Sequence, residues 1–196
     1  MFTGIIEEVG ALVTVRRAGM SARITVHAPR IAEGVEMGDS VAVNGICLTA
    51  VAREGVNLSF DAVPETMSRT NLKVARPGER VNLERAVAAG QPMGGHFVQG
   101  HVDGEGSLRS IHSQDNARIL EVTIPPDLAK YLIPKGSVAV DGISLTVMEA
   151  NPESFTVSII PHTWEHTNLK GKRAGNPVNI EVDMLAKYVE RLLAKE

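Results

Sequence analysis

Short runs of alternating apolar and polar residues dominate the chain, and they occur in the same order twice. Each run has four to eight residues and is rich in β-branched side chains, which is typical of half-buried strands. About six short antiparallel strands per half favour an all-β fold with a small closed barrel in each half, because closure removes exposed strand edges. The runs lie at 12–17, 22–28, 40–43, 46–51, 56–63 and 80–86, then at 106–111, 119–124, 137–140, 143–148, 155–160 and 177–182.

The two halves are copies of one module, related by a shift of 97 residues with a one-residue slip near the start. The segment SVAVNGICLT from Ser40 matches SVAVDGISLT from Ser137 at eight of ten positions. Further on, VNLE from Val81 matches VNIE from Val178. A residue present in both copies is expected to be structural or to serve a role that both share. A residue that differs is a candidate for a role belonging to one copy.

Turn and helix signals also fall at matching places. Asn44-Gly45 and Asp141-Gly142 each separate two apolar runs. Such pairs favour two-residue hairpin turns, because both central positions need positive φ. Short helices are expected after four prolines, since proline fits the first turn of a helix. These prolines are Pro29, Pro64, Pro126 and Pro161.

The matching spans predict two domains, residues 1–96 and 97–183, joined within a Gly-rich segment. The remaining segment, 184–196, has no counterpart in the first half. Its apolar residues recur at helical spacing with charged residues between them, and Asp183 suits an N-cap. The helix either packs on its own barrel or joins subunits. The second interpretation is favoured, because a helix outside the repeat has no module core reserved for it.

Composition narrows the class of protein. A net charge of −3 argues against nucleic-acid binding, which needs a concentrated basic face. The sequence has no run of about 18 apolar residues, so no membrane-spanning helix is expected. The N-terminus lacks the features of a signal peptide. The single cysteine, Cys47, suits a reducing compartment. We therefore expect a soluble cytoplasmic protein.

The strand after each hairpin turn offers candidate chemistry. Alternation places Cys47 and Thr49 on one face of the strand, and Ser144 and Thr146 take the same positions in the second half. One interpretation is that small residues merely fit a tight surface there. The other is that each half presents a ligand site, and the occurrence of the pattern in both halves favours it.

Helix starts give a second candidate. Thr66 and Thr163 follow prolines at matching positions, where free N–H groups and a hydroxyl can bind a polar ligand or simply cap the helix. His162 and His166 are four residues apart, as in some metal sites. Their counterparts are a glutamate and an arginine, with no further ligand cluster evident, so metal binding is not expected.

Several inert residues of the first half become ionisable in the second. His101 replaces Ile5, Lys135 replaces a glycine, and Asp141 replaces an asparagine. Surface charge explains Lys135 well and Asp141 in part, whereas His101 is either a satisfied core histidine or a functional group. The chain also lacks a GxGxxG motif, a Walker loop and a basic phosphate-binding nest. We therefore expect that its ligand is not bound mainly through a phosphate group.

Taken together, MFTGI, NGICLT, DGISLT, GHVDG and IPHTWEHTNL resemble, along the whole chain, the riboflavin synthases of the lumazine-binding repeat family. The resemblance implies two tandem six-stranded Greek-key barrels, each binding one 6,7-dimethyl-8-ribityllumazine, and a homotrimer held by C-terminal helices. It implies a transferase site between the N-terminal barrel of one subunit and the C-terminal barrel of a neighbour. There, one lumazine would give four carbons to another in the last step of riboflavin biosynthesis, without cofactor or metal. Whether a lumazine synthase capsid encloses the trimer stays open.

The family's site residues transfer by position. His101 would assist proton transfer, and Cys47 with Ser40 would aid addition at C7 of the acceptor. Phe2 and Thr3 would order the mouth of the first pocket, and Asp141 and Asp183 would give polar support. The first pocket would use Gly4, Ile5, Ile6, Cys47, Leu48, Thr49, Asp61, Ala62, Val63, Pro64, Glu65 and Thr66. The second would use Gly100, His101, Val102, Lys135, Ser144, Leu145, Thr146, Ser158, Ile159, Ile160, Pro161, His162 and Thr163.

Two alternatives have other functions. A non-catalytic lumazine or flavin antenna protein shares the repeat but characteristically has a degraded second module, whereas both modules here keep their Thr pairs. A flavin-reductase barrel needs an attached nicotinamide domain, and 196 residues leave no room for one.

Overall fold

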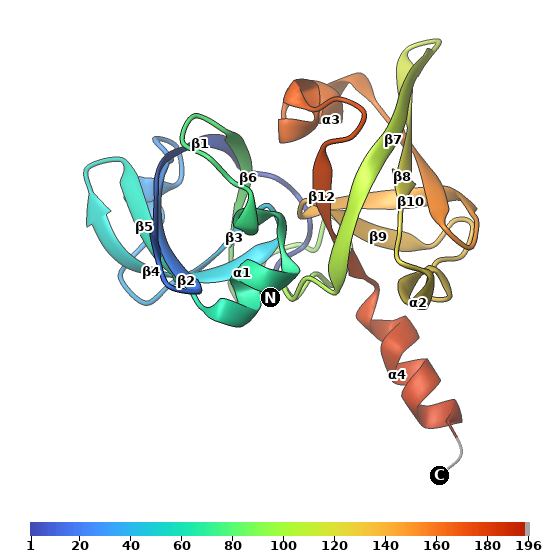
Figure 1. Ribbon diagram of the computed structural model, residues 1–196, viewed down its shortest axis with the longest axis horizontal. Coiled ribbons are helices and arrows are strands. Elements are labelled where there is room, and N and C mark those ends of the chain that lie inside the picture. The colour runs from blue at the N-terminus through green and yellow to red at the C-terminus, as the bar shows by residue number, and fades with distance from the viewer. Residues whose placement is uncertain (195–196) are drawn as a thin grey trace.

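The computed structural model describes residues 1–194, and its strands close into two barrels that lie side by side (Figure 1). The expected all-β fold with two six-stranded barrels and a C-terminal helix is confirmed. The first barrel comprises β1 (Glu8–Ala18), β2 (Ser21–His27), β3 (Ser40–Val43), β4 (Ile46–Glu54), β5 (Asn57–Ala62) and β6 (Arg80–Arg85). The second comprises β7 (Gly104–Gln114), β8 (Ala117–Thr123), β9 (Ser137–Val140), β10 (Ile143–Ala150), β11 (Ser154–Ile159) and β12 (Pro177–Val182).

Both barrels have one topology. Around the first, the strands follow the order β1-β2-β5-β4-β3-β6, and the second repeats this order with equivalent strands. Strands β3, β4 and β5 are joined in sequence, and β6 returns to pair with β3, which is a Greek-key connection. Short helices fill the connections at η1 (Ala32–Gly34), α1 (Pro64–Arg69), η2 (Asn71–Lys73), α2 (Pro126–Ala129), α3 (Pro161–Glu165) and η3 (Asn168–Gly171).

Each barrel has its own apolar core, formed by the alternate, inward-facing residues of its strands. Phe60 fills the first barrel and Phe155 the second, and neither is exposed to solvent. Complete burial of such a side chain contributes about 1.5–3 kcal/mol to folding. Equal shape in the two halves therefore does not require equal residues, since the large aromatic side chain occupies a different strand position in each.

The hairpin turns between β3 and β4 and between β9 and β10 are as expected. Asn44 and Gly45 have φ of 48° and 74°, and Asp141 and Gly142 have φ of 46° and 78°. The two turns also touch each other. A Cβ on Gly45 would lie 2.6 Å from the backbone nitrogen of Gly142, so the tips of the turns meet at the contact between the barrels.

A buried polar network surrounds these turns, and Asp141 is its centre. Its carboxylate is fully buried and accepts hydrogen bonds from Asn71 Nδ2 (3.0 Å), Asn168 Nδ2 (2.8 Å) and Asn179 N (2.8 Å). Lys172 Nζ lies 2.9 Å from the same carboxylate. The structure thus places Asp141 in the polar network between the barrels, and its polar support of the ligand pocket stays a prediction. Its change from asparagine serves the packing of one barrel on the other.

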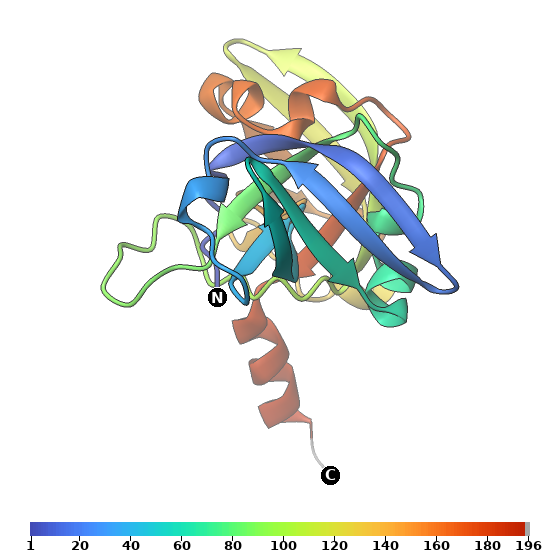
Figure 2. The ribbon, with the colours of Figure 1, turned by 90° about the vertical axis from the view of Figure 1, so that its left-hand side faces the viewer.

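The C-terminal helix α4 (Met184–Leu193) projects away from both barrels (Figures 1 and 2). Asp183 caps it as expected, accepting from Leu185 N at 2.9 Å. Its polar side contacts the second half of the chain. Lys187 forms an ion pair with Asp103, and Glu190 forms one with Lys130. Its apolar side chains, Leu185, Tyr188, Val189, Leu192 and Leu193, are 54–82% exposed. The helix thus does not bury its apolar face on its own barrel.

Residues 195–196, the end of the expected 184–196 helical segment, lie outside the described residues. Within residues 1–194, no helix combines the length and the apolar character needed to cross a membrane.

Candidate active site

The outer face of β3 and β4 presents the candidate residues of the first barrel. Ile46 and Leu48 point inward and are 3% and 4% exposed, whereas Cys47 and Thr49 face outward as expected. Ser40 lies directly opposite Thr49 in the strand register, and Ala42 lies opposite Cys47. Ser40 and Cys47 are therefore diagonal neighbours on one face, close enough for groups of their size to act on one ligand.

The second barrel repeats this face. Ser144 pairs with Ala139, and Thr146 pairs with Ser137, so two hydroxyls again stand next to each other. Ile143 points inward and is 3% exposed. The two barrels therefore offer equivalent outer faces that differ mainly in a thiol or a hydroxyl at the central position.

Two segments that precede the barrels, residues 2–6 and 98–102, each cross to the barrel of the other half and complete these faces. We call them the crossing segments. Cys47 N donates to Gly100 O, and Ser144 N donates to Gly4 O, each at 2.8 Å. Gly100 and Gly4 have φ of 80° and 78°, and a Cβ on either would lie 2.6 Å from the side chain it faces. Only glycine allows this close approach.

The expected grouping of site residues is wrong in this respect. Residues 4–6 were expected beside Cys47, and residues 100–102 beside Ser144. The structure places them the other way round, because the segment before each barrel packs on the barrel of the other half. Ile6 packs on the second core and Val102 on the first. Each face is therefore built from both halves of the chain.

The crossing segments also meet each other. Phe2 and Val98 form a two-residue antiparallel bridge, with N···O distances of 2.7 and 3.1 Å, and both side chains are fully buried. They pack with Ala42 and Ala139 in a small core of their own. Phe2 thus anchors the N-terminal segment rather than lining an open mouth.

The ends of β5 and β11 and the helices that follow them border the two faces. Val63 and Ile160 occupy the N-cap positions of α1 and α3 without a side-chain cap and are 56% and 58% exposed. The capping interpretation of Thr66 and Thr163 is therefore wrong, and their half-buried hydroxyls stay available beside the exposed apolar residues. Asp61 forms an exposed ion pair with Arg23 on the neighbouring strand β2.

Lys135 has a strained backbone. Its φ is 69°, in the left-handed region that its counterpart Gly38 occupies at 95°. The backbone hydrogen bonds are equivalent, since Lys135 N donates to Val147 O and Gly38 N to Ala50 O. A non-glycine residue in this conformation costs of order 1 kcal/mol. The lysine therefore destabilises the backbone of the second half slightly, but it places an ammonium group where the first half has a glycine.

The structure adds one residue that the sequence analysis missed. His96 Nδ1 lies 2.7 Å from Ser144 Oγ. Burial lowers the pKa of His96, partly offset by the nearby Asp183, so a neutral imidazole is favoured beside the hydroxyl. His96 falls at the join between the repeats and has no counterpart, so the comparison of halves could not reveal it. His101, by contrast, is exposed, which excludes the core-histidine interpretation.

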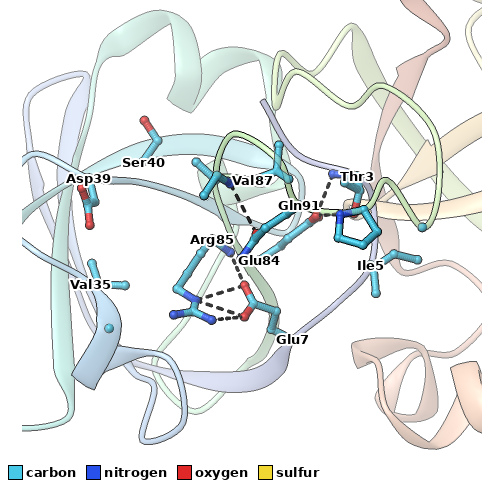
Figure 3. A pocket seen from close by; sticks show the side chains of 15 residues that line it. Thr3, Ile5, Glu7, Val35, Asp39, Ser40, Glu84, Arg85, Val87 and Gln91 are labelled. Atoms are coloured by element: carbon cyan, nitrogen blue, oxygen red, sulfur yellow. Dashed lines mark hydrogen bonds and ion pairs between the residues drawn. The ribbon is translucent and has the colours of Figure 1, made fainter.

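A cavity of about 600 Å³ opens next to these faces, between β3, β6 and residues 86–94 (Figure 3). Among the expected site residues that the structure describes, Thr3, Ile5 and Ser40 line it. Its floor is charged, with the Arg85–Glu7 ion pair at 2.7 Å and the carboxylate of Glu84. Within residues 1–194 no group of three or more His, Cys, Asp or Glu side chains is placed to hold a metal ion.

Comparison with known proteins agrees with this architecture. The lumazine binding domain family matches the chain twice, over residues 3–86 and 99–183. A crystal structure of LumP complexed with 6,7-dimethyl-8-(1'-D-ribityl) lumazine is 25% identical, has a TM-score of 0.85, and covers 93% of this chain and 99% of its own. The chain is thus a tandem lumazine-binding protein.

Full-length relatives define the family more closely. The riboflavin synthase of Bacillus subtilis is 45% identical and is matched over 100% of this chain and 91% of its own length. That of Mycobacterium tuberculosis is 46% identical over 98% of both chains, and that of Actinobacillus pleuropneumoniae is 44% identical over 100% and 91%. The chain belongs to the riboflavin synthase family.

Proposed function

We propose that this chain converts two molecules of 6,7-dimethyl-8-ribityllumazine into riboflavin and 5-amino-6-ribitylamino-2,4(1H,3H)-pyrimidinedione by transfer of four carbons. The observation that supports it most is the pair of equivalent outer faces, each composed of both halves of the chain. A reaction between two copies of one substrate needs two similar sites that orient the heterocycles toward each other. Orientation of two reactants lowers the barrier substantially, because their entropy is lost on binding.

The first site in this proposal consists of the Cys47 face, residues 61–66 and the crossing segment 100–102. The second consists of the Ser144 face, Lys135, residues 158–163 and the crossing segment 4–6. Small hydroxyls and backbone groups suit the neutral ribityl chain and the pyrimidine edge. These residues are proposed as ligand contacts on the strength of their exposure and grouping.

Residue roles follow from their places. His101 is exposed on the segment that contacts Cys47, so it can take a proton from the acidic C7 methyl of a lumazine in the first site. Cys47, with Ser40 diagonal to it, can add to C7 of the acceptor. At the second site, His96 beside Ser144 gives a neutral imidazole and hydroxyl pair that can exchange a proton with the bound ligand.

We also propose that α4 assembles three copies of the chain, with residues 1–96 and 97–183 as the two domains and 184–196 as the trimerisation helix. Support comes from the apolar face of α4, which the chain's own barrels leave exposed. The active site would then lie between the first barrel of one subunit and the second barrel of its neighbour. The unpaired Cys47 agrees with a cytoplasmic location.

One assay tests the activity directly. The protein is incubated with 6,7-dimethyl-8-ribityllumazine alone, and riboflavin absorbance is followed. We expect the protein to form riboflavin. His101→Ala should be strongly impaired, whereas the exposed control His112→Ala should be unaffected. Tight lumazine binding without riboflavin would favour the antenna alternative, and full turnover by His101→Ala would remove that residue from proton transfer.

A second experiment tests the assembly. Leu192 is 82% exposed on α4, so Leu192→Glu should leave the barrels folded and convert a trimer into monomers in analytical ultracentrifugation. Activity should fall with the loss of trimer if the site is shared between subunits. A fully active monomer would refute the intersubunit site while leaving the reaction itself in place.

A further inference from the structure

Two buried glutamates occupy equivalent positions behind the crossing segments. Glu84, on β6, is 5% exposed. Its Oε1 accepts from Thr3 N at 2.7 Å and from Thr3 Oγ1 at 2.8 Å, and its Oε2 accepts from Gly4 N at 3.0 Å (Figure 3). The carboxylate therefore fixes the N-terminal segment at the residue just before Ile5.

Glu181, on β12, does the same in the second half. It is 3% exposed. Its Oε1 accepts from Gln99 N at 2.6 Å, and its Oε2 accepts from Gly100 N at 2.9 Å and from His101 N at 3.1 Å. The two glutamates match each other under the 97-residue shift, as the last residues of VNLE and VNIE.

A carboxylate suits this position for a physical reason. The N–H groups of residues 3–4 and 99–101 lie outside the strands of either barrel and outside the Phe2–Val98 bridge, so side-chain acceptors bind them. A carboxylate has two acceptor oxygens and can serve several donors at once, whereas a glutamine offers one acceptor and turns an NH₂ group toward the remaining donors. Hydrogen bonds to a charged acceptor are also stronger than neutral ones.

Each crossing glycine is held from both sides. Gly100 donates its N–H to Glu181 of the second barrel and accepts at its C=O from Cys47 N of the first. Gly4 donates its N–H to Glu84 of the first barrel and accepts at its C=O from Ser144 N of the second. Loss of the carboxylate would remove the hydrogen bond to the glycine N–H and leave the C=O contact, so the segment would be held less firmly against the face that it borders.

We propose that Glu84 and Glu181 are positioning residues, each of which holds one wall of one lumazine site against the barrel of the other half. Glu181 sets the position of the segment that carries His101 beside Cys47, and Glu84 sets that of the segment that carries Ile5 beside Ser144. This assignment rests on the proposed function for its catalytic consequence, but its geometry does not depend on turnover. Burial raises the pKa of both carboxyls, which the N–H donors partly offset.

The only cysteine of the chain gives a direct reporter. Glu181→Gln should expose Cys47 and accelerate its reaction with a disulfide reagent such as DTNB by roughly tenfold, the factor that corresponds to loss of one charge-assisted hydrogen bond. Glu84→Gln loosens the other segment, so it should change the Cys47 rate by less than about twofold. Glu149→Gln, an exposed change on β10, is the matched surface control.

A mirror experiment moves the thiol to the other face. In a Cys47→Ser, Ser144→Cys background, Glu84→Gln should accelerate the thiol reaction and Glu181→Gln should not. Equal acceleration of both reporters by either glutamine variant would mean general destabilisation and would overturn the proposal. No acceleration by the cognate variant would overturn it as well. Neither outcome depends on whether riboflavin forms.

Kinetics supply the functional side of the test. Glu181→Gln should lower kcat, because it displaces His101, whereas Glu84→Gln should act mainly on KM, because Ile5 offers only contact area. Glutamate-to-aspartate variants should recover part of each loss. If Glu84→Gln fails to fold, Thr3→Val removes one donor to the same carboxylate and should give a smaller rise of the Ser144→Cys thiol rate. Unchanged thiol rate and unchanged KM in Thr3→Val would count against the proposal.

Discussion

The polar network between the barrels includes an ion pair of the second half that has no equivalent in the first half. Asp141 and Lys172 lie 2.9 Å apart at positions where the first half has Asn44 and Ala75. The Asp141 side chain is fully buried and that of Lys172 is 14% exposed. The double variant Asp141→Asn, Lys172→Ala therefore gives the second half the residues of the first. The two single variants each leave one charge without its partner.

The magnitude follows from what each variant leaves behind. Lys172→Ala leaves a buried carboxylate that still accepts from three N–H donors, so we expect a loss of about 3 kcal/mol, the low end for breaking a buried pair. Asp141→Asn leaves an ammonium that retains Pro177 O as an acceptor and can reach water, so a loss of about 1–2 kcal/mol is expected. The double variant should lose less than the sum, with a coupling of about 1–3 kcal/mol.

Urea unfolding of the four proteins, followed by circular dichroism, measures this coupling. The cycle requires equal m-values, because a changed m would mean that the barrels no longer unfold together. Single-variant losses that add to within about 0.5 kcal/mol in the double variant would refute the reasoning. They would mean that the pair contributes no interaction beyond the packing of its separate side chains.

Three further predictions concern other parts of the molecule. Gly45→Ala should cost about 3 kcal/mol in thermal unfolding because its Cβ would meet the backbone of Gly142, whereas Gly55→Ala, with a φ of 59° and open space, should cost about 1 kcal/mol; equal costs would contradict the tip-to-tip contact. Burial lowers the pKa of His96, so its neutral form stabilises the fold above about pH 6.5 and this contribution is lost as the pH falls through the lower folded value. An imidazole NMR titration should give a midpoint below about 6.5, and a higher midpoint would show that Asp183 outweighs burial. Arg23→Ala should leave the urea midpoint of unfolding unchanged within error, because the Arg23–Asp61 pair is half exposed, and a clear fall of the midpoint would point to a role beyond that pair.

Local patterns were sufficient to predict the barrels. The turns at Asn44-Gly45 and Asp141-Gly142 require positive φ, and alternation alone places Cys47 and Ser144 outward. Pro64, Pro126 and Pro161 likewise mark the starts of short helices, whereas η1 begins three residues after Pro29. These features depend on residues that are neighbours in sequence, so a single sequence contains the information.

Which barrel each crossing segment packs on was not predictable in this way. Nothing in residues 4–6 distinguishes contact with Cys47 from contact with Ser144, because the two faces are nearly the same. The change from Asn44 to Asp141 was a real signal with a different cause, since burial and the partner Lys172 are tertiary facts. The glutamates behind the segments had a signal that was available, namely an acidic residue at the same place in the matching VNLE and VNIE segments.

Because the barrels exchange their N-terminal segments, the single chain has the geometry of a domain-swapped dimer whose two subunits are fused. An isolated half would lack one wall of its own face and would have to borrow it from a second identical copy. Identical copies must place identical residues on both sides of the axis. Asn168 Nδ2 contacts both Asn44 and Asp141, so aspartate at both positions would bring two carboxylates together there. Fusion of the two copies into one chain removes the requirement for identical residues. One copy can then acquire a charge, a histidine or a lysine that the other does not have.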